Sequence, residues 1–109
     1  MSQKLVIKKW VAGQVAKLGE IDFPDTGPAK LTVWAKDAAA EELRTAWDTV
    51  QAMPVIRMKW SESDPGDKSG DSQLLKGRDV AKGHPDYPRA VGDILSRRYG
   101  LFASPAELG

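Results

Sequence analysis

The stretch Lys30 to Trp60, KLTVWAKDAAAEELRTAWDTVQAMPVIRMKW, decides the fold because it reads as strand, helix and strand with short connections. Its middle part spaces apolar residues along one helical face and ends before Pro54. Residues 55–60 then alternate between apolar and cationic side chains, as in a sheet covered on one side. We therefore expect an α/β packing unit in which residues 31–59 form one compact crossover.

The segment before this stretch is rich in strand-forming residues. Residues 4–12 and about 14–23 predict a hairpin that turns at Ala12-Gly13. The prolines and the Asp-Thr-Gly triplet of residues 23–30 are typical of a loop. The hairpin should therefore connect through this loop to the strand that starts at Leu31.

The segment after Trp60 begins with a polar stretch, residues 61–72, which we expect to be a mobile loop. A short strand over about 73–76 and a second loop over 76–86 should follow. The last helix should begin near Asp86 and stop at Gly100, a residue type suited to a left-handed helix end. We expect the tail, about 103–109, to be frayed.

These elements predict one α+β domain over residues 1–109. We expect a two-layer sandwich: a four- or five-stranded sheet with two helices packed on one face. Asp37 is the expected N-cap of the first helix. The predicted core comprises Leu31, Val33, Leu43, Trp47, Val50, Ile56, Met58, Val91, Ile94, Leu95 and Tyr99.

Composition excludes several classes of function. The 109 residues include no cysteine and one histidine, so neither a disulfide framework nor a thiolate or imidazole metal site can form. We expect no metal and no cofactor. The longest apolar runs are far too short to span a membrane, and we expect a cytoplasmic protein. The net charge of +1 indicates no partner by itself.

The most informative candidate surface is the sheet face that the helices would leave open. Strand parity places Trp34 opposite Leu31 and Val33, and it places Trp10 on the same face as Lys8. We predict that this face carries Trp10, Trp34, Arg57, Lys59 and Lys8. Tryptophan and arginine are typical of protein interfaces, which favours a non-enzymatic module that binds a protein partner or itself. Aromatic rings with cations on a sheet also suit single-stranded nucleic acid, the first alternative. The face would be lost if the hairpin or the last helix covered it.

A second candidate is the basic, glycine-containing segment that precedes the last helix. Lys76, Arg78, Lys82 and His84 could hold an anion near a helix N-terminus. This gives a further alternative, an enzyme or binder that takes a phosphorylated small molecule. The segment matches no known phosphate loop, and a solvated turn whose glycines serve backbone geometry is the commoner explanation of such a pattern. No nucleophile with a nearby base is evident elsewhere, so we predict no catalytic residues.

Overall fold

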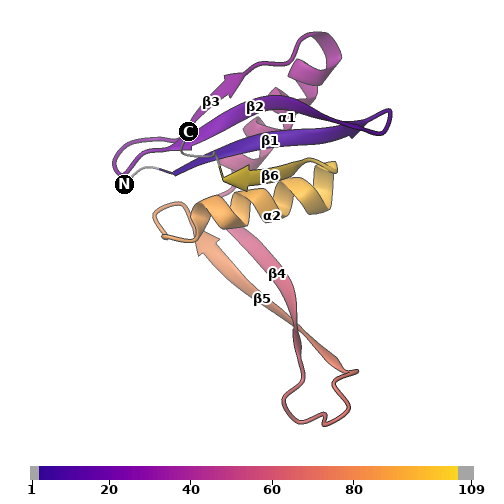
Figure 1. Ribbon diagram of the computed structural model, residues 1–109. Helices are drawn as coiled ribbons and strands as arrows, with labels where there is room; N and C mark the ends of the chain where they lie inside the picture. Colours follow the sequence, from indigo (N-terminus) through magenta and orange to yellow (C-terminus); the bar gives the residue numbers. More distant parts are fainter. Residues whose placement is uncertain (1–2, 106–109) are drawn as a thin grey trace.

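The computed structural model of the protein describes residues 3–105 and has an α+β fold (Figure 1). Its elements, in chain order, are β1 (Gln3–Val11), β2 (Gln14–Phe23), β3 (Lys30–Val33), α1 (Asp37–Gln51), β4 (Val55–Ser63), β5 (Gln73–Ala81), α2 (Tyr87–Tyr99) and β6 (Phe102–Pro105).

The first sheet is antiparallel and has the order β3-β2-β1-β6. The predicted hairpin is confirmed, with Val11 opposite Gln14 across a two-residue turn. Ala12 and Gly13 have φ angles of 51° and 79°, and two left-handed residues are what a turn of this length requires. The sheet is completed from the far end of the chain, because β6 pairs with β1.

A bulge interrupts the β1–β2 register, because Ile7 lies opposite Gly19 but Lys8 lies opposite Lys17. The extra residue leaves both Leu18 and Gly19 buried. A Cβ atom at Gly19 would overlap the Thr32 carbonyl oxygen and would lie 2.8 Å from Leu43 Cδ2. Glycine is therefore required where β2 passes between β3 and α1.

The prediction of a single sheet with a crossover from β3 to β4 is wrong. β4 and β5 form a separate two-stranded antiparallel sheet, which projects away from the rest of the molecule in Figure 1. The outer edge of β4 meets α2 instead of another strand. The Lys59 N–H donates to the Asp93 carboxylate at 3.3 Å, and Arg97 donates to the Arg57 carbonyl at 2.6 Å. These α2 side chains occupy backbone groups that a crossover strand would have used.

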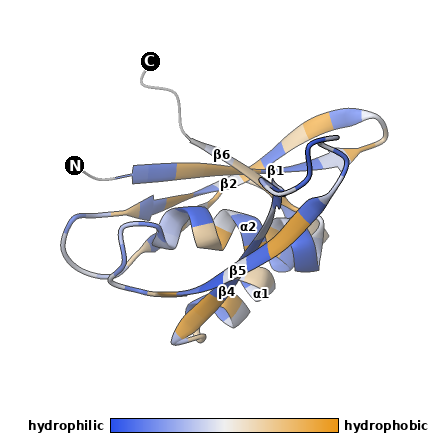
Figure 2. Cartoon of the chain, turned by 90° about the horizontal axis from the view of Figure 1, so that it is seen from below, coloured by the Kyte–Doolittle hydropathy of each residue, from blue (hydrophilic) through white to orange (hydrophobic). Residues whose placement is uncertain are grey.

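The core lies between the inner face of the four-stranded sheet, the two helices and the base of the β4–β5 hairpin. Both helices contribute buried residues to the core that they share with the four-stranded sheet (Figure 2). Eight of the predicted core residues are buried, whereas Leu31, Val33 and Tyr99 are partly buried and pack against the core. The sequence prediction missed the hairpin's contribution and several residues near α2, namely Leu5, Ile7, Leu18, Ile21, Phe23, Val80, Tyr87, Ala90 and Leu101.

The helix ends agree only partly with the predictions. Gly100 ends α2 with a φ of 65°, as predicted, and its N–H donates to the Ser96 carbonyl. Asp37 makes no side-chain cap: it has a φ of 56°, and Lys36 is the residue at the N-cap position. Asp86 is the N-cap residue of α2, but its carboxylate pairs with Arg78 and makes no cap hydrogen bond.

The predicted loops and tail are shorter in the structure. β4 continues to Ser63 and includes the first residues of the predicted loop 61–72, while β5 runs from Gln73 to Ala81 and includes residues 76–81 of the other predicted loop. The Asp67 carboxylate accepts hydrogen bonds from the backbone N–H groups of Ser69 and Ser72 within the remaining loop. Residues 103–105 belong to β6 and are not frayed, because they pair with β1. The rest of the predicted tail lies outside the described residues.

Replacing Trp47 with alanine should lower the free energy of unfolding by about 3–5 kcal/mol, the usual cost of removing a large buried aromatic side chain. The indole is 5% exposed and meets Phe23 edge-to-face, with a distance of 6.4 Å between ring centroids. Thermal denaturation measures this effect. A melting temperature within a few degrees of wild type would contradict the placement of this ring in the core.

Gly19→Ala should destabilise the protein by about 1–3 kcal/mol, because the added methyl group overlaps backbone atoms that cannot move independently of β3. Gly83→Ala is the matched control, since a Cβ atom there would have no neighbour within 4 Å. We expect the control to stay within about 0.5 kcal/mol of wild type in urea denaturation. Equal effects of the two substitutions would refute the close approach at Gly19.

Candidate aromatic–lysine surface and pocket

Along the strands of the four-stranded sheet, side chains of the outer face alternate with side chains that are buried. The two ends of the outer face differ in character. Near the β2–β3 end, Lys4 lies opposite Asp22 and forms an ion pair with Glu20, with 3.7 Å between the Lys4 Nζ and Glu20 Oε1 atoms. Near the Ala12-Gly13 turn, the face carries aromatic, aliphatic and lysine side chains. The acidic side chains of this face, Glu20 and Asp22, therefore lie at the end away from the turn, where Lys4 pairs with Glu20.

The end near the turn forms a surface that we call the aromatic–lysine surface, which consists of Lys8, Trp10, Lys17, Trp34 and Phe102. Lys8 lies between Lys17 and Phe102 in the strand register. Trp10 lies 6.2 Å from Phe102, measured between ring centroids, and is 63% exposed. The Trp34 N–H donates to the Leu18 carbonyl of β2, and its side chain is 46% exposed.

The direction of the Trp34 side chain follows from its neighbours. Val33 and Ala35, on either side of it in sequence, both pack against the core. Because successive side chains of an extended segment point in opposite directions, the Trp34 ring points away from the core. Trp10, Trp34 and Lys8 thus share the outer face that the sequence predicted for them.

The other two predicted members of this surface lie elsewhere. Arg57 and Lys59 belong to β4, which is part of the two-stranded sheet and not of the sheet that carries Trp10. Arg57 pairs with Asp79 at 3.3 Å, and its guanidinium lies against Gly77. The expectation that all five side chains share one face is wrong, because it assumed a single sheet. Lys17 and Phe102 lie on this face instead. Strand alternation missed Lys17 because the bulge shifts the β1–β2 register, and it missed Phe102 because β6 pairs with β1.

The structure also divides the predicted anion-binding segment. Lys76 and Arg78 are on β5, not in a loop, and they pair with Glu62 and Asp86 respectively. Hydrogen bonds from Lys76 and Trp60 lower the pKa of Glu62 from its ordinary value, so the carboxylate that holds Lys76 is ionised at neutral pH. The four cations of the predicted site therefore do not converge on one ligand.

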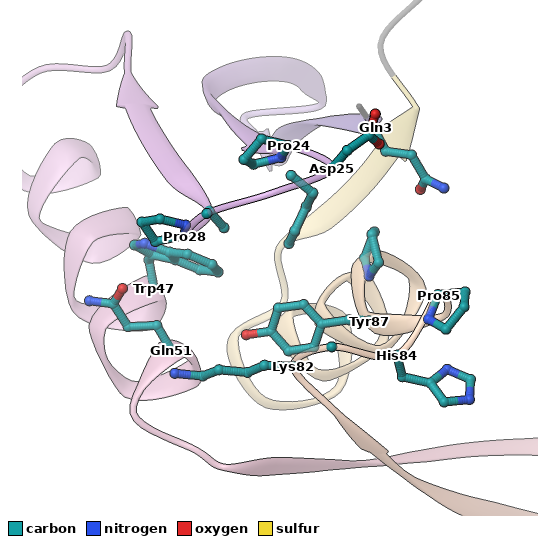
Figure 3. A pocket seen from close by; sticks show the side chains of 15 residues that line it. Gln3, Pro24, Asp25, Pro28, Trp47, Gln51, Lys82, His84, Pro85 and Tyr87 are labelled. Atoms are coloured by element: carbon teal, nitrogen blue, oxygen red, sulfur yellow. The ribbon is translucent and has the colours of Figure 1, made fainter. Parts of the chain in front are cut away.

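The remaining two, Lys82 and His84, line a pocket of about 680 Å³ (Figure 3). The pocket lies between the β2–β3 loop, α1 and the β5–α2 loop. The Nδ1 atom of His84 accepts a hydrogen bond from the Asp86 N–H at 3.0 Å. The residues that line this pocket are Gln3, Phe23, Pro24, Asp25, Gly27, Pro28, Ala29, Trp47, Gln51, Lys82, Gly83, His84, Pro85, Tyr87 and Pro88.

Three aromatic residues form the wall of this pocket. Phe23 meets both Trp47 and Tyr87 edge-to-face, with centroid distances of 6.4 and 5.8 Å. Burial raises the pKa of Tyr87, so its hydroxyl stays protonated at neutral pH and can act as a donor. In Figure 3 the Tyr87 hydroxyl and the Lys82 side chain point toward Trp47 and Gln51, while the His84 ring points away. The sequence identified Lys82 here but not the aromatic wall.

Comparison with known proteins identifies no relative: no protein-family model, no curated protein and no solved structure matches this chain. Within residues 3–105, no group of three or more histidine, aspartate or glutamate side chains is arranged to hold a metal ion. Neither helix of the described chain has the length and apolar character needed to cross a membrane.

Proposed function

We propose that this protein is a non-enzymatic binding module that takes single-stranded nucleic acid on the aromatic–lysine surface. One observation carries the proposal: Lys8 and Lys17 lie side by side among three aromatic rings on an uncovered sheet face. Neither lysine has an ion-pair partner within residues 3–105. Their charge is therefore available to a ligand.

The chemistry of the surface matches this class of ligand. Unstacked bases gain free energy by lying on exposed aromatic rings, and this contact tolerates any base sequence. Lysines beside the rings can contact the phosphates between successive bases. The neighbouring Lys9 points to the opposite side of β1, where it forms an ion pair with Glu42 at 2.8 Å. Only Lys8 and Lys17, which the strand alternation directs to the outer face, would therefore contact the phosphates.

A protein partner, or a second copy of the chain, is the alternative occupant of the same face. It is favoured by the exposed apolar side chains next to the surface, Val11 and Val15, which lie at the same hairpin end as Trp10. Salt distinguishes the two occupants. Binding that depends on phosphate contacts weakens steeply as salt is raised, whereas an apolar protein interface responds weakly.

Trp10→Ala should weaken binding of a fluorescein-labelled ten-nucleotide oligothymidine by about 1–3 kcal/mol, through the loss of one stacked base. If Lys8 and Lys17 each contact a phosphate, log K for binding should fall with log salt with a slope of about −1.4. The double variant Lys8→Ala/Lys17→Ala should make this slope shallower. Fluorescence anisotropy measures both quantities.

Lys9→Ala is the matched control for this experiment, because it removes one lysine from the same strand on the opposite face. It should leave the affinity and the salt slope near wild type. A duplex of the same length should bind more weakly, since its bases are stacked on each other. No binding at low salt, or an affinity that Trp10→Ala leaves unchanged, would reject nucleic acid as the ligand. Sedimentation that showed a dimer broken by Trp10→Ala would favour self-association instead.

A further inference from the structure

We propose that the pocket between α1, the β2–β3 loop and the start of α2 binds a small aromatic anion, with its ring against Trp47 and its anionic group on the Lys82 ammonium and the Tyr87 hydroxyl. This site is separate from the aromatic–lysine surface, and the inference does not rest on nucleic-acid binding. It is carried by the cavity, its aromatic wall and two polar groups that have no partner in the described chain.

The size and the wall of the pocket suit a small organic molecule. A volume of about 680 Å³ lies within the usual range for small-ligand sites, which are mostly apolar with a few placed polar groups. The wall consists of the Trp47, Phe23 and Tyr87 rings, and Pro28 lies beside Trp47 in Figure 3. Flat rings pack against such a wall edge-to-face or offset, as these three already do with one another.

The polar groups of the pocket select for negative charge. Lys82 is exposed, and it has no ion-pair partner within residues 3–105. The two acids nearest along the chain, Asp79 and Asp86, are engaged by Arg57 and Arg78 respectively. Asp25 also lines the pocket, but Figure 3 places it beside Gln3, away from the Lys82 amino group. Lys82 is thus a cation that a ligand can neutralise.

Tyr87 adds a donor in a fixed position. Its side chain is buried and held by the edge-to-face contact with Phe23, and no hydrogen bond from its hydroxyl is found in the described chain. The hydroxyl points into the pocket beside Lys82 in Figure 3. An ammonium and a neutral hydroxyl together suit a carboxylate or a phosphate, because both anions accept several hydrogen bonds.

Two probes separate the sources of the anionic group: 4-hydroxybenzoate carries a carboxylate, and adenosine 5′-monophosphate carries a phosphate. The chain has four tryptophans, so ¹H–¹⁵N spectra should show four indole signals, which Trp10→Phe, Trp34→Phe and Trp60→Phe assign. We expect at least one probe to shift the Trp47 signal in a saturable manner. Uncharged adenosine should bind at least about tenfold more weakly than its monophosphate if phosphate is the group recognised.

Two substitutions then test the anion contacts without disturbing the core. Lys82→Met removes the ammonium group but keeps a long unbranched side chain, and it should weaken binding of the active probe at least about tenfold. Tyr87→Phe keeps the ring and should weaken binding of the active probe about two- to tenfold, with an unchanged melting temperature. Lys68→Met, in the exposed loop at the tip of the β4–β5 hairpin, is the matched control and should have no effect.

Three results would overturn the inference. The first is that neither probe shifts the Trp47 signal at millimolar concentration. The second is that only the Trp10 and Trp34 signals move, which would assign the probe to the aromatic–lysine surface. The third is that Lys82→Met and Tyr87→Phe bind the active probe as tightly as wild type.

Discussion

The packing of α2 between two separate sheets is the constraint on which the rest of the structure depends. Its buried residues contact β1 and β6 on one side and β4 and β5 on the other. Two of its polar residues, Asp93 and Arg97, also hydrogen-bond the free edge of β4. A two-stranded hairpin is marginal in water without such support. Both the closure of the core and the position of the hairpin therefore depend on this one helix.

The two proposed sites follow from this arrangement. Because the buried residues of the helices and of the β4–β5 hairpin pack against inner side chains of the four-stranded sheet, Trp10 and Trp34 on its other side stay exposed and Lys8 stays half-buried. Because α2 starts beside α1, the loops that precede β3 and α2 meet around Trp47 and enclose the pocket. One site is a flat, cationic sheet surface, and the other is a concave aromatic pocket. They suit ligands of different size, and their tests use different residues.

The aromatic–lysine surface shows which side-chain placements the local sequence pattern could predict and which it could not. Alternation along a strand was enough to place Trp10, Trp34 and Lys8 on the exposed side of the chain. It could not place Arg57 and Lys59 relative to them, because that depends on whether β3 and β4 share a sheet. It also missed Lys17, since the bulge at Leu18 and Gly19 shifts the register by one residue. Phe102 joins the surface only through the pairing of β6 with β1.

Helix spans, the first hairpin and part of the core could be read directly from residue order, because they depend on periodicity, turn chemistry and stop signals within a few neighbours. Which sheet a strand joins could not be predicted from residue order, because an antiparallel pair and a crossover place the same local demands on a strand such as Val55–Ser63. That choice is made by contacts between residues distant in sequence, here the side chains of Asp93 and Arg97 on the backbone of β4. Long-range packing likewise assembled the pocket, whose lining comes from four segments with no shared motif.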